Sequence, residues 1–143
     1  MTLLSILYAI LVFGLIILVH EFGHFTVAKL SGIAVYRFSI GFGPALLKWT
    51  RGGTDYALRL FPIGGAVVMR GEAEVDDDGE PEQYRNIPGK GYNEASWIQR
   101  FSVSIAGSVM NVLCGLVILI IVMMPVAAVP SGTITSTRDA PAA

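Results

Sequence analysis

The sequence predicts a membrane protein, mainly α-helical, in which two transmembrane helices are joined by a membrane-reentrant or cytoplasmic β-hairpin or small antiparallel sheet. Hydrophobic residues make up 53% of the 143 residues and charged residues only 15%. With a mean hydropathy of +0.62, this composition lies outside the range of ordinary soluble domains. Two long apolar runs lie towards the ends of the chain, and two stretches between them alternate with a period of two. These observations place helices at the ends and strands in the middle.

The first apolar run extends from Leu3 to Val19, and the helical pattern continues towards Leu30. A membrane helix needs roughly 20 such residues, so we expect residues 1–30 to form the first transmembrane helix. A secretory signal peptide is the alternative. That alternative is disfavoured because no basic segment precedes the run and no small-residue cleavage pattern follows it.

The β-structure is expected within residues 31–75. In residues 35–42, VYRFSIGF, large apolar side chains alternate with polar or small ones, which predicts a strand. The Gly43-Pro44 pair is expected to end this strand. A second alternation runs through residues 54–69, where the proline and paired glycines within 62–65 predict a sharp turn.

Residues 76–100 are expected to form a cytoplasmic loop followed by an interfacial segment. Seven acidic residues and no basic one occur between Glu72 and Glu82. Such a run is typical of a solvated loop, and it lacks the ligand spacing of a calcium-binding EF-hand. Trp97 and Arg100, at the approach to the second apolar run, are residue types that favour the membrane interface.

The second transmembrane helix is expected over residues 101–129, around the apolar run from Ile105 to Met124. Gly107, Asn111 and Gly115 recur at a spacing of four residues, which favours the close approach of another helix. A role of Asn111 in supporting an active site or a bound substrate is the alternative.

The distribution of charge predicts the orientation of the chain. Nine of the ten basic residues lie between residues 29 and 100, and the tenth is Arg138. The middle of the chain is therefore expected in the cytoplasm and both termini outside it. No basic cluster indicates a nucleic-acid partner, and the single cysteine, Cys114, provides neither a disulfide framework nor a cysteine zinc site.

The segment HEFGH, residues 20–24, carries the chemistry. His20 and His24 lie four residues apart, so on a helix they share one face and can bind one zinc ion. A third ligand would leave one position for water, and Glu21 is placed to take a proton from that water and pass it to a departing amine. A chance match with packed histidines is the alternative. Against it, the chain has only these two histidines, and ionisable groups in an apolar helix usually mark function.

Four segments occur in the order HEFGH, FSIGFGP, LFPIGG and IAGSVMN. In these segments the chain resembles the site-2 protease family of intramembrane zinc metalloproteases, and most of all its regulator-of-sigma-E protease branch. The resemblance implies His20 and His24 as zinc ligands and Glu21 as general base. It also implies a membrane-reentrant hairpin near the active site, a multi-pass protein of the bacterial cytoplasmic membrane, and regulated intramembrane proteolysis of single-pass membrane proteins such as anti-sigma factors.

A protease cannot hydrolyse a peptide bond that is enclosed in a helix, so a transmembrane substrate has to be unwound and held extended, for which a strand edge is suited. The segment LFPIGG is the candidate edge, and the predicted substrate-binding residues also include Asn111. They are Phe61, Pro62, Ile63, Gly64, Gly65 and Asn111. The alternative is a hairpin that only packs against the helices.

The chain departs from the family pattern in two places. Ser108 stands where the family has proline after the glycine, which puts the local helix geometry in doubt. The family completes its zinc site with an aspartate from a later membrane helix, in a motif like LDG, and no such motif occurs in the sequence. Asp55, Glu72, Glu74, water or a partner chain are the alternatives for the third position.

Residues 130–143 resemble the start of an extracytoplasmic PDZ-type domain. We therefore expect the chain to be the N-terminal part of a longer protease whose remainder supplies the aspartate. The alternative function is a non-catalytic membrane module that binds a metal or a substrate helix.

Overall fold

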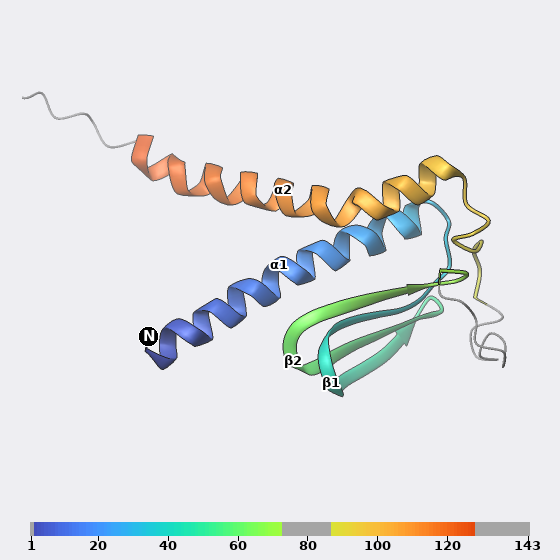
Figure 1. The fold of residues 1–143 in the computed structure, drawn as a ribbon, viewed down its shortest axis with the longest axis horizontal. Helices are drawn as coiled ribbons and strands as arrows, with labels where there is room; N and C mark the ends of the chain where they lie inside the picture. Colours follow the sequence, from blue (N-terminus) through green and yellow to red (C-terminus); the bar gives the residue numbers. More distant parts are fainter. Residues whose placement is uncertain (1, 73–86, 128–143) are drawn as a thin grey trace, which may run out of the picture.

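The computed structural model describes residues 2–72 and 87–127, and its elements follow the order α1 (Leu3–Leu30), β1 (Val35–Arg51), β2 (Thr54–Met69) and α2 (Trp97–Ala127). The two helices meet near the C-terminal part of α1 and diverge towards the N-terminus of α1 and the C-terminus of α2 (Figure 1). The strands lie beside α1. Most of the acidic run and the expected PDZ-like segment fall outside the described residues.

Both helices are long and apolar enough to cross a membrane, since an 18-residue window has a mean hydropathy of 2.7 within Leu3–Leu30 and 2.6 within Trp97–Met124. Thr2 caps α1, its side chain accepting a hydrogen bond from the Ser5 N–H. The start of α2 at Trp97 lies four residues before the expected boundary, and a capping box explains it. The Ser96 side chain accepts from the Gln99 N–H, and the Gln99 side chain accepts from the Ser96 N–H.

The helices touch at positions where a side chain is missing. A Cβ on Gly23 would lie 2.5 Å from the carbonyl oxygen of Ala106 and 2.9 Å from Cγ of Met110. Only a glycine lets the two backbones approach this closely. The contact therefore fixes which residues of α2 face the motif on α1.

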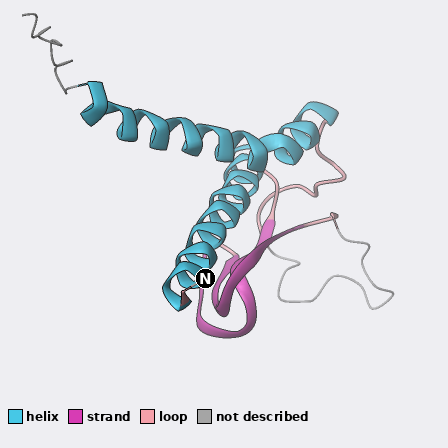
Figure 2. Cartoon of the chain, turned by 60° about the vertical axis from the view of Figure 1, so that its left-hand side comes forward, coloured by secondary structure: helices cyan, strands magenta, loops and turns pink. Residues whose placement is uncertain are grey.

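The two strands are long and bent, and they pair more than once. Arg51↔Thr54 to Ala45↔Arg59 form an antiparallel hairpin, whereas residues 35–40 pair with residues 65–69 and also with residues 55–58. The expectation that Gly43-Pro44 ends the first strand is wrong, because β1 continues to Arg51. Gly41 and Gly43 have φ values of 83° and 86°, a conformation that glycine adopts without strain, so the chain bends and changes partner there. Figure 2 shows the strands folded back alongside α1.

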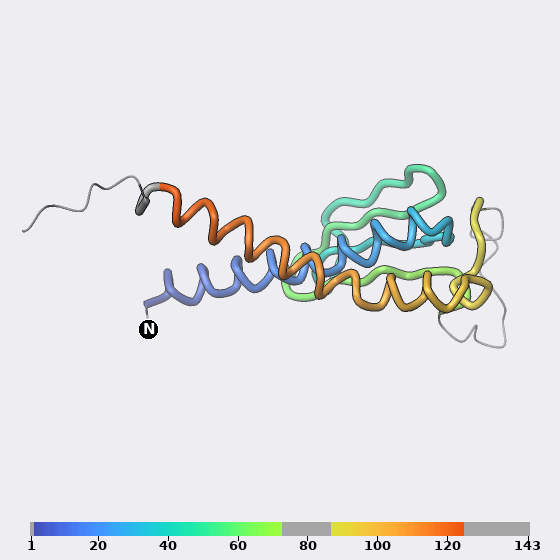
Figure 3. The backbone as a smooth tube through the Cα atoms, turned by 90° about the horizontal axis from the view of Figure 1, so that it is seen from above, coloured from blue at the N-terminus to red at the C-terminus, as the bar shows by residue number. Residues whose placement is uncertain are grey.

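The core lies at the end of the molecule where the helices meet. Ala28, Ile33, Val35, Met69, Ala95 and Val103 are its buried residues. The Thr54 hydroxyl donates to the Val35 carbonyl over 2.8 Å, and Ala34 and Gly32 exchange backbone hydrogen bonds with Lys90. The N-terminal half of α1 and the C-terminal half of α2 extend away from the strands (Figure 3). The well-packed part thus adjoins the HEFGH segment.

Candidate metal centre

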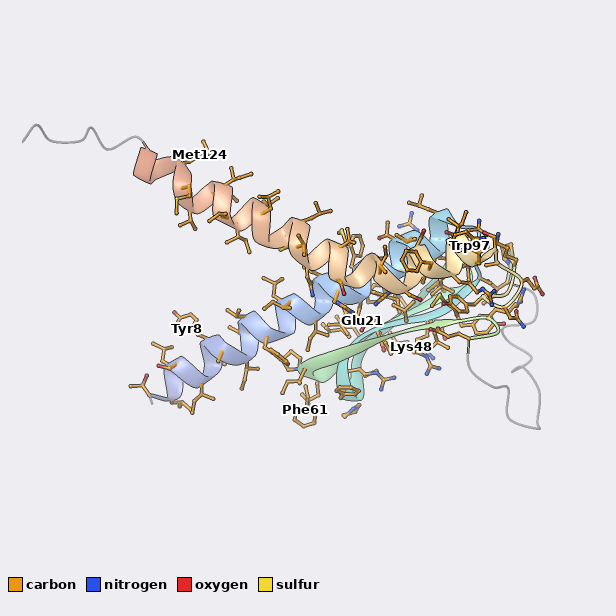
Figure 4. The ribbon with its side chains drawn as sticks, turned by 45° about the horizontal axis from the view of Figure 1, so that its top comes forward. Tyr8, Glu21, Lys48, Phe61, Trp97 and Met124 are labelled. Carbon is orange, nitrogen blue, oxygen red and sulfur yellow. The ribbon has the colours of Figure 1, made fainter. Side chains whose placement is uncertain are left out.

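The HEFGH segment lies in the C-terminal half of α1, where α1, α2 and the strands come together around Glu21 (Figure 4). Helical spacing places both histidines on one face of α1. Their rings meet edge to face with centroids 4.8 Å apart. The two Nε2 atoms are 3.1 Å apart, so both imidazoles aim at one point.

The orientation of His24 is fixed by α2. Its Nδ1 lies 2.6 Å from the carbonyl oxygen of Val103. A carbonyl can only accept, so Nδ1 carries the hydrogen and donates it. In neutral His24 the lone pair is therefore on Nε2, the nitrogen that faces His20 and that a metal would use.

His20 also has a partner on α2. The amide nitrogen of Asn111 lies 3.3 Å from His20 Nδ1. With the amide placed this way, Asn111 donates to His20, His20 donates to His24 and His24 donates to Val103. When His20 Nε2 holds a metal, the hydrogen is on Nδ1, and turning the amide by half a rotation presents its oxygen as the acceptor.

Gly107 of α2 covers the point at which the two histidines aim. A Cβ there would lie 2.5 Å from His24 Nε2 and 2.6 Å from His20 Nε2. Distances this short are close to metal–nitrogen bond lengths of about 2.0–2.1 Å. The missing side chain of Gly107 thus leaves room beside both nitrogens for an ion.

The residues present fit a zinc ion. Two nitrogens bound to a tetrahedral zinc lie about 3.3 Å apart when each bond is about 2.0–2.1 Å, close to the 3.1 Å observed between the Nε2 atoms. Both Nδ1 atoms also have partners on α2, as is usual for histidines that bind zinc.

A third protein ligand is not assembled. Within residues 2–72 and 87–127 no group of three histidine, cysteine, aspartate or glutamate residues could hold a metal. Asp55 is engaged in the hairpin, where it accepts from the Thr50 hydroxyl over 2.7 Å and lies 3.7 Å from Lys48 Nζ. Glu74 lies outside the described residues. Glu72 is the remaining acidic candidate, and it lines the same cavity as Glu21 and His24.

This cavity has a volume of about 410 Å³ and opens beside the motif. It is bounded by α1, by the last residues of β2, by Tyr92 and by α2. Its lining residues are Glu21, His24, Ala66, Val67, Met69, Glu72, Tyr92, Val103 and Ser104. Partial burial raises the pKa of Glu72; a backbone hydrogen bond with Met69 and the charge of His24 oppose the rise, and Glu21 adds to it. Glu72 thus faces the same space as the motif.

Glu21 lies against the end of the sheet. A Cβ on Gly65 would come within 2.7 Å of Cγ of Glu21 and 3.1 Å of the Ser39 carbonyl oxygen. Because Gly65 has no side chain, it leaves the space that the Glu21 side chain occupies between α1 and the strand. Residues 65–69 pair with β1 on one edge, and three of them, Ala66, Val67 and Met69, line the cavity.

The other residues of LFPIGG lie farther along the bend. A Cβ on Gly14 of α1 would be 2.5 Å from the Pro62 carbonyl oxygen, so the bend packs on α1 there. Phe61 and Ile63 are exposed, at 55% and 44%, and Gly64, with a φ of 89°, faces the ring of Phe42. Of the segment, Gly65 is the residue that the structure brings to the motif.

Two contributors to the site had no side-chain signal of their own. Val103 acts through its backbone carbonyl, which any residue would provide. Gly107 was expected only to pack against a helix, and the structure places it over the two histidine nitrogens. Its spacing from Asn111 was visible in the sequence, but the identity of the surface it meets was not.

Comparison with known proteins places these residues in a family. The sequence model of peptidase family M50 matches residues 8–140. A protein of Clostridium acetobutylicum, provisionally named a zinc metalloprotease, is 40% identical over 124 residues, covering 87% of this chain and 34% of the relative. A protein of Clostridium perfringens with the same kind of name is 44% identical over 115 residues, covering 80% of this chain and 31% of the relative. The chain spans about a third of the length of these two relatives.

Proposed function

Because the chain belongs to peptidase family M50, we propose that it carries the HEFGH part of a zinc peptidase active site that hydrolyses peptide bonds in transmembrane segments of single-pass membrane proteins. The observation that carries the proposal is the pair of Nε2 atoms 3.1 Å apart beside the cavity that Glu21 lines. Anti-sigma factors remain the substrate class that the resemblance to regulator-of-sigma-E proteases implies.

The chemistry is divided among few groups. Bound zinc would polarise the peptide carbonyl and lower the pKa of water. His20 and His24 would hold the zinc ion, and Asn111 and the Val103 carbonyl fix the orientation of the two rings. Glu21, in the cavity wall, accepts the proton of the attacking water and delivers it to the departing amine.

The heights of the elements along α1 support a site within the membrane. If α1 crosses the bilayer, His20 lies about 15 Å from the Leu30 end of the helix, at 1.5 Å per residue. Pro62 packs on Gly14, about 24 Å from that end. The bend of the strands would then re-enter the bilayer from the same side as the loop between β2 and α2. With the termini outside, that side is the cytoplasm of a bacterial cell.

The strand next to Glu21 is suited to hold an extended substrate. Residues 65–69 use one edge to pair with β1, and the cavity lies against this segment. A free edge within a membrane leaves backbone groups without partners, which is costly until another strand binds them. An unwound substrate segment would provide that strand, so its peptide bond would lie close to Glu21.

A second function is kept because the described part of the chain provides two metal-binding histidines and no assembled third ligand. As an N-terminal part of a longer protease, the chain would receive an aspartate from the remainder. Without one, it would bind a metal or a substrate helix and cleave nothing.

A chimera separates the two functions. The chain would replace the matching residues of the C. perfringens relative, with and without Glu21→Gln, in proteoliposomes with zinc and a single-pass substrate labelled at both ends. Cleavage that requires Glu21 supports the peptidase. Retained zinc or bound substrate without any product supports the binding module, loss of zinc binding contradicts the peptidase, and loss of both zinc and substrate binding contradicts both functions.

A further inference from the structure

The cavity beside Glu21 has a second polar wall that hydrolysis does not use. Glu21 and His24 bound the reaction end, and Ala66, Val67 and Met69 bound the strand side. Tyr92, Ser104 and Glu72 complete the lining. None of these three binds the histidines or Glu21 through a hydrogen bond that is observed.

The two hydroxyl groups of this wall, on Tyr92 and Ser104, donate their hydrogen bonds to other atoms of the protein. Ser104 donates to the Arg100 carbonyl over 3.0 Å. The Tyr92 hydroxyl lies 3.2 Å from the Ser104 oxygen and 3.4 Å from the Arg100 carbonyl oxygen. Because the Ser104 hydrogen is committed to the carbonyl, Tyr92 donates to one of these two oxygens. Both hydroxyl oxygens are therefore left with lone pairs to offer.

Glu72 adds a carboxylate to the same acceptor set. It lies three residues after the end of β2, and its N–H donates to the Met69 carbonyl over 3.4 Å. The Tyr92 N–H donates to the Arg70 carbonyl over 2.6 Å, and the Arg70 N–H donates to the Ala34 carbonyl over 2.9 Å. Glu72 keeps much of its surface accessible. The segments that carry Glu72 and Tyr92 are thus tied together while the carboxylate remains reachable.

We propose that Glu72, Tyr92 and Ser104 form a subsite for a hydrogen-bond-donating, preferentially cationic side chain of the substrate, such as lysine, next to the bond presented to Glu21. The wall offers acceptors only, and an ammonium group carries three donors and no acceptor. The volume of about 410 Å³ is in the range of pockets that bind small ligands. This inference rests on the proposed function, because it deepens the description of the same site.

The test uses the zinc-loaded, detergent-purified chain carrying Glu21→Gln, so that no peptide is consumed. Fluorescent apolar peptides differ at one position, which holds lysine, its uncharged isostere norleucine, or glutamate, and that position is moved along the series. Binding is measured by anisotropy. At one position we expect lysine to bind at least about tenfold more tightly than norleucine, as a charge-assisted hydrogen bond gives, and glutamate to bind most weakly.

Further variants assign the preference to the wall. Adding Glu72→Gln should abolish the lysine preference, and adding Tyr92→Phe should reduce it. Glu94→Gln is the matched control, because Glu94 is exposed outside the cavity lining and its oxygen accepts from the Gly91 N–H, which glutamine can still do. Circular dichroism checks that each variant is folded.

Equal binding of lysine and norleucine at every position would overturn the subsite, as would a preference that survives Glu72→Gln or is equally lost in Glu94→Gln. Zinc titration of the same preparations separates the two ideas. A chain that binds zinc through His24 but shows no lysine preference refutes the subsite alone. A chain whose zinc binding does not depend on His24 refutes the proposed function.

Discussion

Gly107→Ala adds one methyl group at the point where the two histidines aim. The new Cβ would lie 2.5 Å from His24 Nε2, 2.6 Å from His20 Nε2 and 2.7 Å from His20 Cδ2. Cβ atoms essentially never make contacts below 3.0 Å. The rings cannot turn away freely, because each Nδ1 is hydrogen-bonded to a residue of α2. The added methyl group therefore acts directly on the metal site.

The size of the effect follows from these distances. To reach an ordinary contact of 3.4 Å, the gap to His24 Nε2 has to open by about 0.9 Å. Ligand distances in plausible zinc sites lie within about 0.2 Å of their usual values. Loss of an outer partner alone costs 10–100-fold in metal affinity. We therefore expect Gly107→Ala to weaken zinc binding by about 100-fold or more, roughly 3 kcal/mol.

The assay is a zinc titration against a chelator of known affinity, on detergent-purified protein, with thermal unfolding as a check of the fold. Gly115→Ala is the control on the same helix, because a Cβ there meets no atom of the described residues within 4 Å. It should bind zinc as the parent does. Equal zinc affinities of the Gly107→Ala and Gly115→Ala variants would refute the assignment of this space to the ion.

Three further predictions concern the surroundings. Asn111→Ala should lower zinc affinity by about tenfold in the same titration, whereas Asn111→Asp, which keeps an acceptor for the imidazole N–H, should bind more tightly than the alanine variant; the opposite order would contradict the assigned contact. Gly65→Ala, whose Cβ would be 2.7 Å from Glu21 Cγ, should leave zinc binding intact and slow cleavage by the chimera about 100-fold, and unchanged cleavage would show that Glu21 is not held there. Thr54→Val removes the buried hydroxyl donor to the Val35 carbonyl and should cost about 1–2 kcal/mol of stability in thermal unfolding without changing zinc affinity; unaltered stability would speak against this bond.

The helices could be predicted because apolar composition alone sets them. The two apolar helices and the antiparallel strands are confirmed. The continuation of β1 through Pro44 could not be predicted from local signals. Pro44 has no partner in the strand register, so its missing N–H costs no ladder hydrogen bond. The continuation of β1 past Pro44 depends on a change of partner strand, which involves residues distant in the sequence.

The site was predictable as far as it lies on one helix. Spacing within α1 is enough to bring His20 and His24 together, whereas their contacts with Val103, Gly107 and Asn111 join residues far apart in the sequence. The four-residue spacing of Gly107, Asn111 and Gly115 did not show which of them would contact the histidines. Gly107 meets both histidines, but Gly115 meets nothing in the described part of the chain.

The fold distinguishes between the acidic residues considered as a third zinc ligand, which composition does not. Asp55 is turned to Thr50 and Lys48 within the hairpin. Glu72 faces the cavity of the motif because β2 ends there. The register of a bent strand decides this, and no local pattern in the acidic run indicates it.

The most direct test of the metal centre is a zinc titration of the purified chain, its Glu21→Gln variant and its His24→Ala variant. The described geometry predicts one zinc ion per chain, bound with similar affinity by the parent and Glu21→Gln and lost in His24→Ala. Zinc binding that is absent from the parent, or that His24→Ala leaves unchanged, would contradict a metal centre formed by the two histidines.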